Sequence, residues 1–122
     1  MSNNFKKIFV ADDDIDILSI IQIILELEGY EVHATVNAND IFNYEKKFPD
    51  LIILDIWMGK VDGRKICGQL KKHNLMKDIP VMFISANADI KEMKELYNAQ
   101  EYISKPFEMR KLLDKVNAIL LN

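Results

Sequence analysis

The sequence has little of what marks several common protein classes. It contains one cysteine, Cys67, so no disulfide can form within the chain, and we expect this side chain to fill a small space in the core. No apolar run reaches the roughly 20 residues that a membrane-spanning helix needs. Residues 1–7 are polar, where a signal peptide would carry an apolar stretch. These absences predict a soluble cytoplasmic protein with no membrane partner.

A strong charge of either sign is missing as well. The net charge is −3, from 16 basic and 19 acidic side chains. The densest basic group, Lys71, Lys72 and Lys77, is typical of a solvated helix end. Without a basic stripe the surface does not match a phosphate backbone, so we expect no direct binding to nucleic acid. The chain also lacks repeats and a Pro/Gly/Ser-rich linker, and its 122 residues suit one domain spanning 1–122.

The chain does contain strand patterns that alternate with helical patterns. Strands are predicted at residues 8–11, 30–34, 51–54, 81–84 and 102–103, and helices at 17–27, 37–47, 62–70, 90–97 and 109–120. We expect Gly29 to close the first helix, Asp62 to cap the third, and Gly63 and Gly68 to weaken that third helix. The alternation predicts an α/β fold with a doubly wound parallel sheet, because five strands are too few for a closed barrel.

Polar side chains stand at the carboxyl ends of four predicted strands, where such sheets form their functional crevice. In chain order they are Asp12, Asp13, Asp14, Asp55, Ser85 and Lys105. Two carboxylates about 4 Å apart repel by roughly 4 kcal/mol at an effective dielectric constant near 20, so we expect a cation among them. Oxygen ligands without a nearby histidine or cysteine favour Mg²⁺.

The same side chains suit phosphoryl transfer, which needs a nucleophile, a metal ion and fixed donors for the remaining charge. Asp55 stands alone at its strand end and is the natural phosphoacceptor. Asp12 and Asp13 would hold the metal ion. The Ser85 hydroxyl and the Lys105 ammonium group would each contact a phosphoryl oxygen.

Five segments of the chain resemble the response-regulator receiver domains of two-component and phosphorelay signalling. They are IFVADDDIDI at 8–17, PDLIILDIWM at 49–58, VDG at 61–63, ISA at 84–86 and YISKPF at 102–107. The resemblance covers nearly the whole chain, and the motifs follow one another in the family's order and spacing. It implies a five-stranded parallel sheet in the order 2-1-3-4-5 with helices on both faces.

The resemblance also implies a magnesium site and partner proteins. Mg²⁺ would be held by Asp13, Asp55 and the backbone carbonyl of Trp57, with Asp12 acting through water. The phosphoryl group would come from a histidine kinase or a histidine phosphotransfer protein, and the phosphorylated domain would bind a downstream protein target. Such a domain is not a turnover enzyme: it accepts and slowly hydrolyses its own aspartyl phosphate.

A conformational switch follows from the same resemblance. Phosphorylation is expected to draw Ser85 inward and to let Tyr102 rotate inward, which remodels the face formed by the fourth helix, fifth strand and fifth helix. The Lys105–Pro106 peptide bond is expected to be cis. A simpler interpretation of Tyr102, as a residue at the edge of the core, stays open.

Three residues depart from the family pattern without removing a chemical group. Gly59 replaces the usual proline after Met58, which loosens the loop beside the metal ion. Trp57 is bulkier than the usual residue and could shield the acyl phosphate. Asn98 replaces a glycine after the fourth helix, and asparagine also tolerates the left-handed conformation.

Rival functions remain beside the receiver interpretation. An aspartyl-phosphate phosphatase of the haloacid-dehalogenase kind needs a second aspartate where Trp57 stands. A flavodoxin-like binding module needs a hydroxyl-rich phosphate loop where this chain has acidic residues. A receiver-like domain that only binds partners, without phosphorylation, stays open. So does the choice between a stand-alone regulator and a piece of a longer one.

Overall fold

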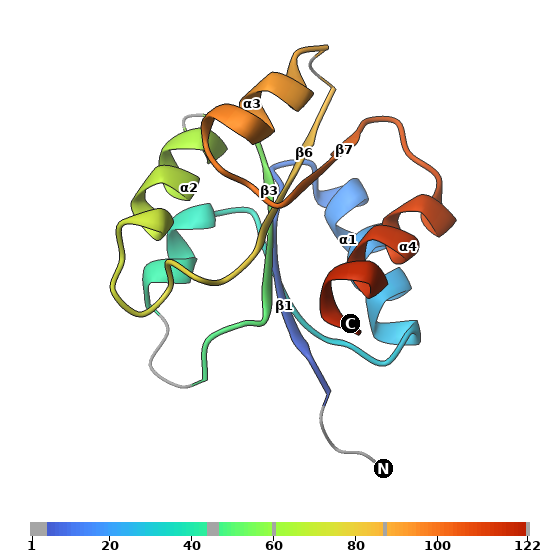
Figure 1. The fold of residues 1–122 in the computed structure, drawn as a ribbon. Coiled ribbons are helices and arrows are strands. Elements are labelled where there is room, and N and C mark those ends of the chain that lie inside the picture. The colour runs from blue at the N-terminus through green and yellow to red at the C-terminus, as the bar shows by residue number, and fades with distance from the viewer. Residues whose placement is uncertain (1–4, 44–46, 60, 87, 122) are drawn as a thin grey trace.

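The computed structural model describes residues 5–43, 47–59, 61–86 and 88–121, and strands alternate with helices along them (Figure 1). The main-sheet strands are β1 (Lys7–Ala11), β2 (Glu31–Thr35), β3 (Leu51–Asp55), β6 (Val81–Ser85) and β7 (Glu101–Ser104). The helices are α1 (Ile15–Leu27), α2 (Gly63–Lys71), α3 (Ile90–Leu96) and α4 (Met109–Leu120). None of these helices combines the length and apolar composition that crossing a membrane requires.

All neighbouring strands of the main sheet run parallel, in the order β2-β1-β3-β6-β7. Counted within this sheet alone, the order is 2-1-3-4-5, which confirms the expected topology. Helices α1 and α4 cover one face, and α2 and α3 cover the other (Figure 1). The strand order reverses between β1 and β3, and a crevice is expected outside the carboxyl ends of these two strands.

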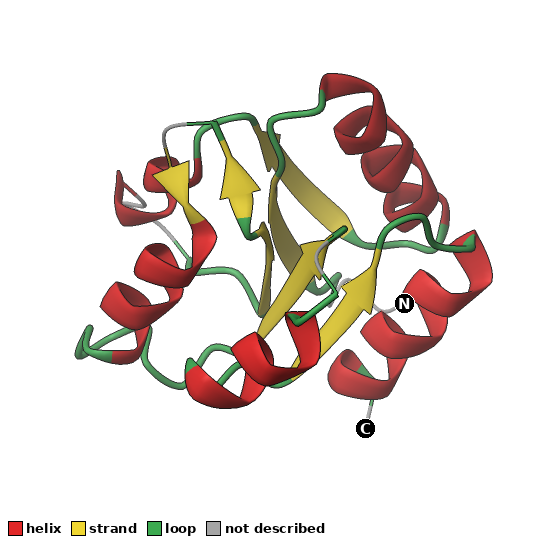
Figure 2. Ribbon diagram, turned by 90° about the horizontal axis from the view of Figure 1, so that it is seen from above, coloured by secondary structure: helices red, strands yellow, loops and turns green. Residues whose placement is uncertain are grey.

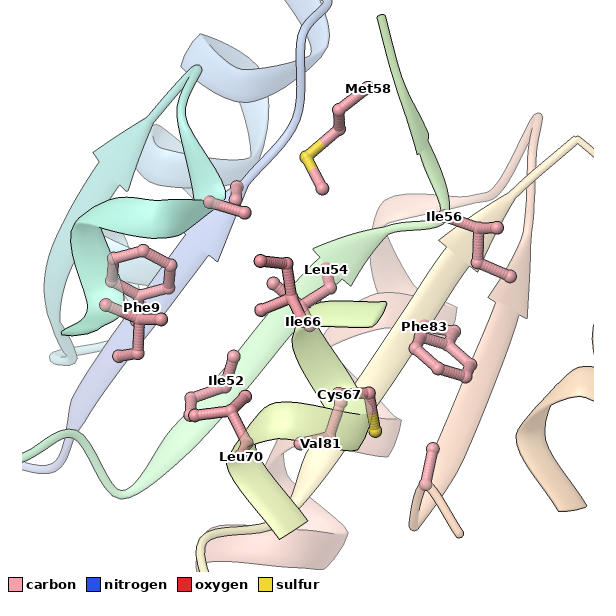
Figure 3. Packing of buried hydrophobic residues seen from close by; sticks show 14 of the residues in the cluster. Phe9, Ile52, Leu54, Ile56, Met58, Ile66, Cys67, Leu70, Val81 and Phe83 are labelled. Atoms are coloured by element: carbon pink, nitrogen blue, oxygen red, sulfur yellow. The ribbon is translucent and has the colours of Figure 1, made fainter. Parts of the chain in front are cut away.

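Each face of the sheet has its own apolar core, because successive strand residues point to opposite faces. Phe9 of β1 belongs to the cluster under α2 and α3, whereas its neighbours Ile8 and Val10 belong to the cluster under α1 and α4. Figure 3 shows the first cluster, in which Cys67 of α2 is fully buried. Burial raises the pKa of the Cys67 thiol to about 11, which fits the core role expected for it.

Local sequence signals set most helix ends. Gly29 after α1 and Asn98 after α3 both adopt positive φ angles, 101° and 62°, as predicted. The Asp62 side chain accepts a hydrogen bond from the backbone N–H of Arg64 at 2.8 Å and so caps α2, also as predicted.

Two elements between β2 and α2 differ from the prediction. The segment predicted as a helix over 37–47 forms a 3₁₀ helix at Ala38–Asn43, and the rest of that prediction falls partly outside the described residues. A short hairpin of β4 (Trp57–Met58) and β5 (Val61–Asp62) follows β3 and was not predicted (Figure 2). Strands of two residues carry no readable periodicity, so the sequence gives no signal for them.

Candidate functional site

A cavity of about 530 Å³ opens at the carboxyl edge of the main sheet. It is lined by Asp13, Asp14, Asp55, Trp57, Ser85, Ala86 and Lys105. These residues come from the ends of β1, β3, β6 and β7 and from the hairpin after β3. The cavity therefore lies where the strand order of the sheet predicts a crevice.

Three carboxylates gather at this edge. Asp12 follows β1 and Asp55 ends β3, and the parallel register that pairs Ala11 with Leu54 brings the two side chains together. Asp12 and Asp55 are 0% and 4% exposed, while Asp13 is exposed to solvent. One oxygen from each of the three carboxylates lies within 4.8 Å of the others, the spacing of a cluster that could hold a metal ion.

Lys105 is the counter-ion of the two buried carboxylates. Its Nζ lies 2.9 Å from Asp12 Oδ2 and 3.1 Å from Asp55 Oδ2. Burial alone would lower the pKa of Lys105, but the two carboxylates outweigh it and the pKa is raised. Lys105 follows β7, and its backbone N–H donates a 2.8 Å hydrogen bond to the carbonyl of Ser85 at the end of the neighbouring strand β6. The Lys105–Pro106 peptide bond is cis.

The pKa of Asp55 is raised from 3.8 to about 6. Burial is the largest cause and the charge of Asp12 the second, and Lys105 acts in the opposite direction. Among the described residues, the ammonium group of Lys105 thus does not outweigh burial and the charge of Asp12 at Asp55. Both buried carboxylates also make local backbone contacts: the N–H of Asp14 donates to Asp12 Oδ1 at 2.9 Å, and that of Trp57 to Asp55 Oδ1 at 3.3 Å.

These groups fit a hard divalent cation. Asp12 Oδ2 is buried and, although Lys105 Nζ is near, accepts no hydrogen bond of good geometry from the described residues. Buried charged oxygens of this kind are costly unless paired or bound to a metal ion. An oxygen-only donor set with surplus negative charge, beside an open cavity, is the environment that Mg²⁺ prefers.

The start of α2 adds two residues whose contacts sequence reasoning missed. Gly63 was expected to weaken α2, and its close approach to β3 was not foreseen. A Cβ atom at Gly63 would lie 2.3 Å from the backbone oxygen of Asp55, so a glycine is required for α2 to start this close to β3. Arg64 places its guanidinium carbon 4.3 Å from the centroid of the Trp57 ring. The VDG segment at 61–63 could have suggested a special role for Gly63, but nothing in the sequence pointed to the contact between Arg64 and Trp57.

The two predicted switch residues lie on neighbouring strands. Ser85 ends β6, is 1% exposed and lines the cavity. Tyr102 of β7 is partly buried, packs against the cluster under α2 and α3, and is not among the residues that line the cavity. Lys115 of α4 lies over its ring, with Nζ 5.4 Å from the centroid, and pairs with Glu101 at 3.0 Å.

Comparisons with known proteins agree with this geometry. Residues 8–117 match the family described as the response regulator receiver domain. The chain is 35% identical over 118 residues to the alkaline phosphatase synthesis transcriptional regulatory protein PhoP of Bacillus subtilis, covering 94% of this chain and 48% of PhoP. It is 33% identical over 118 residues to RpaA of Synechocystis, described as a DNA-binding dual master transcriptional regulator, covering 93% and 48%. The chain thus spans about half the length of these curated relatives.

Solved structures give the same result for the fold. A putative response regulator from Chloroflexus aurantiacus superposes with a TM-score of 0.88 at 27% identity, covering 98% of this chain and 100% of that one. The chemotaxis response regulator CheY4 of Vibrio cholerae gives a TM-score of 0.86 at 22% identity, covering 96% and 100%, which supports the fold alone.

Proposed function

Since the chain belongs to the family of response regulator receiver domains, we propose that it is a phosphoryl-accepting switch whose acceptor is Asp55. One observation carries the proposal: a buried carboxylate, paired with a lysine and adjoining two further carboxylates, faces an open cavity. That arrangement provides a nucleophile, a cation site and a positive donor within one pocket.

In the proposed reaction the Asp55 carboxylate oxygen forms a bond to phosphorus as the phosphorus–nitrogen bond to a donor histidine breaks. The donor would be a histidine kinase or a histidine phosphotransfer protein. Lys105 and the Ser85 hydroxyl would each contact a phosphoryl oxygen, because both line the cavity beside Asp55. Mg²⁺, held by Asp13, Asp55, the Trp57 carbonyl and, through water, Asp12, would neutralise phosphoryl oxygens.

Lys105 would exchange partners in the reaction. Before transfer, its ammonium group lies within 3.1 Å of Asp55. Phosphorylation of Asp55 converts the carboxylate into an acyl phosphate, a mixed anhydride whose negative charge lies on the phosphoryl oxygens in the cavity. The ammonium group is then free to pair with a phosphoryl oxygen, an interaction roughly twice as strong as a neutral hydrogen bond.

The output would arise on the face formed by α3, β7 and α4. Ser85 pairs with Ser104 of β7 in the parallel ladder, and Phe83 pairs with Tyr102. A shift of Ser85 toward a phosphoryl group would therefore displace β7, the strand that carries Tyr102. The changed face would then bind a downstream protein target. Hydrolysis of the aspartyl phosphate would reset the switch slowly. The DNA binding named for RpaA belongs to a protein about twice as long, and we propose no direct nucleic-acid contact for this domain.

Phosphorylation by a small donor tests the proposal. The protein is incubated with acetyl phosphate, with and without Mg²⁺, and its intact mass is recorded. A single phosphoryl adduct that requires Mg²⁺ is expected for the wild type and for Asp50→Asn, and not for Asp55→Asn. If neither the wild type nor Trp57→Ala, which removes the bulky ring at the cavity, gains an adduct, the domain is an interaction module and the proposal is wrong.

A further inference from the structure

The Trp57 indole borders the acidic cavity but has little to hold it there. Its side chain is 48% exposed, which is unusual for the largest apolar side chain of a domain. Trp57 is among the residues that line the cavity, together with Asp55, Ser85 and Lys105. A half-exposed indole keeps rotamer freedom unless a neighbour restrains it.

Arg64 is that neighbour. Its guanidinium carbon lies 4.3 Å from the centroid of the Trp57 ring, within the range of a cation–π contact. Arg64 is not among the residues that line the cavity. Trp57 therefore borders the cavity as a residue, and its ring has a cation over one face.

The guanidinium group is itself clamped. Its Nε lies 3.0 and 3.1 Å from the two carboxylate oxygens of Asp62, and a terminal nitrogen donates to Asp62 Oδ2 at 2.7 Å. Asp62 stands opposite Trp57 in the β4–β5 ladder and also caps α2. The pair is well shielded, with side chains 24% and 25% exposed. Hairpin and helix together thus fix the cation relative to the ring.

We propose that Arg64, gripped by Asp62, is a positioning residue that holds the Trp57 indole at the mouth of the acidic cavity and so slows the access of small phosphodonors and of water to Asp55. The inference rests on the proposed function and adds a control on its rate. Arg64 does not contact the phosphoryl group in this arrangement, because its Nε and a terminal nitrogen are engaged by Asp62 and the group lies outside the cavity lining.

The indole would affect two reactions at Asp55. In the first, a small donor such as acetyl phosphate transfers its phosphoryl group and leaves as acetate. In the second, a water oxygen bonds to phosphorus, the bond from phosphorus to the Asp55 oxygen breaks, and inorganic phosphate and the free carboxylate result. Both need an unobstructed path to Asp55, so a restrained indole would slow loading by small molecules and lengthen the life of the phosphorylated state.

A double-mutant cycle tests the inference in the whole domain. Rates of adduct formation with acetyl phosphate and of adduct loss are measured for the wild type, Arg64→Ala, Trp57→Ala and the double variant, all with Mg²⁺. Arg64→Ala is expected to raise both rates about two- to five-fold, the population change that follows from losing an exposed cation–π contact. In the Trp57→Ala background the same change is expected to have no effect, because Arg64 acts through the ring.

Arg110→Ala is the matched control. It removes the same side chain and the same charge, and Arg110 is also near an aspartate, with 3.9 Å to Asp114, but the guanidinium group over the Trp57 ring is that of Arg64. Its rates are expected to equal those of the wild type. Arg64→Lys keeps a cation but loses the two-pronged grip on Asp62, so its rates should fall between those of the wild type and Arg64→Ala.

Fluorescence of Trp57, the chain's one tryptophan, gives a readout that a merely structural role of Arg64 would not move. Acrylamide should quench it more strongly in Arg64→Ala than in Arg110→Ala at equal thermal stability. Unchanged quenching, or rates that rise equally in the Trp57→Ala background, would overturn the inference while leaving the proposed function intact. Absence of any Mg²⁺-dependent adduct in all variants would overturn the proposed function, and the inference with it.

Discussion

The two ends of the main sheet hold the same kinds of charged residue in opposite ways. At the amino end, the N–H of Lys7 donates to Asp50 Oδ2 at 2.8 Å, and its Nζ lies 3.4 Å from Glu31, whose side chain is 63% exposed. Lys47 lies 4.0 Å from the same Asp50 oxygen. Two carboxylates thus face two cations there among the described residues, and Glu31 and Lys47 are largely exposed to water.

At the carboxyl end, the described residues place three carboxylates around one ammonium group. The side chains of Asp12 and Asp55 are 0% and 6% exposed, and that of Lys105 is 16% exposed. At the amino end, ion pairs and hydrogen bonds join β1 to Glu31 of β2 and to Asp50 before β3. At the carboxyl end, the carboxylates lie close together beside a cavity. The contrast shows that the same residue types pair one to one where water reaches them, and raise the pKa of a carboxyl group where they are buried together.

Replacing the lysine at each end of the sheet is expected to give the largest difference in the free energy of unfolding. Lys105→Met is expected to lower the free energy of unfolding by about 4 kcal/mol in Mg²⁺-free buffer, because it leaves two buried carboxylates without a counter-ion. Lys7→Met at the hydrated end is expected to cost no more than about 1 kcal/mol. Urea denaturation at neutral pH measures both. Equal losses would show that the two ends do not differ, and added Mg²⁺ should restore part of the Lys105→Met loss alone.

Replacing the aspartate at each end should give effects of opposite sign. The folded-state pKa of Asp55, about 6, lies above its unfolded value of 3.8. Ionisation of Asp55 therefore opposes folding: stability falls as the pH rises from about 4 to 6 and the penalty is constant above. At 1.36 kcal/mol per pH unit, Asp55→Asn should stabilise the Mg²⁺-free domain by about 3 kcal/mol at neutral pH.

The matched change Asp50→Asn should destabilise the domain by about 1 kcal/mol, since it weakens a charge-assisted hydrogen bond to the backbone of Lys7. Denaturation curves from pH 4 to 8 measure both variants. The advantage of Asp55→Asn over the wild type should vanish below about pH 4. An advantage that does not depend on pH would contradict the charge explanation.

Substitutions at two glycines of α2 compare the first turn of the helix, which lies against β3, with the middle of the helix. Gly63→Ala places a Cβ 2.3 Å from the Asp55 backbone oxygen and is expected to destabilise the domain by about 2 kcal/mol. Gly68→Ala meets nothing within 4 Å and is expected to stabilise it by about 0.5–1 kcal/mol through helix propensity. Thermal unfolding by circular dichroism distinguishes these signs, and two stabilising changes would disprove the close approach.

The smallest effect is expected at the amino end, in the connection from α3 to β7. Asn98 has a φ angle of 62°, which glycine adopts at lower cost. Asn98→Gly is expected to change the free energy of unfolding by less than about 1 kcal/mol and to leave the phosphorylation rate unchanged. A changed rate would mean that the amino end of the sheet influences the site at its other end.

The sequence predicted the fold well because its signals are local and repeated. Buried strands appear as short apolar runs, and Gly29 and Asn98 mark helix ends by conformational preference alone. The positions of Asp12, Asp55, Ser85 and Lys105 followed from one rule, that the carboxyl ends of parallel strands meet at one edge. The structure brings these four side chains together, while the chemical role of each stays a prediction.

What could not be predicted depends on contacts between elements. The strands of the β4–β5 hairpin are too short to show a periodic pattern in the sequence, so the pairing of Trp57 with Asp62 could not be predicted. The stacking of Arg64 on Trp57 depends on side-chain rotamers that no spacing rule encodes. The contact of Gly63 with β3 was missed because helix propensity describes a helix in isolation, whereas this residue lies against a strand.

The close approach at Gly63 has a practical meaning for anyone who re-engineers this domain. The residue has no side-chain chemistry, yet its lack of a Cβ atom allows the first turn of α2 to lie against β3. A library that varies Trp57 and Arg64 to tune signalling lifetime should hold Gly63 constant. A substitution at Gly63 would displace α2 from β3, and the resulting loss of activity could be mistaken for a change in reaction rate at an intact site.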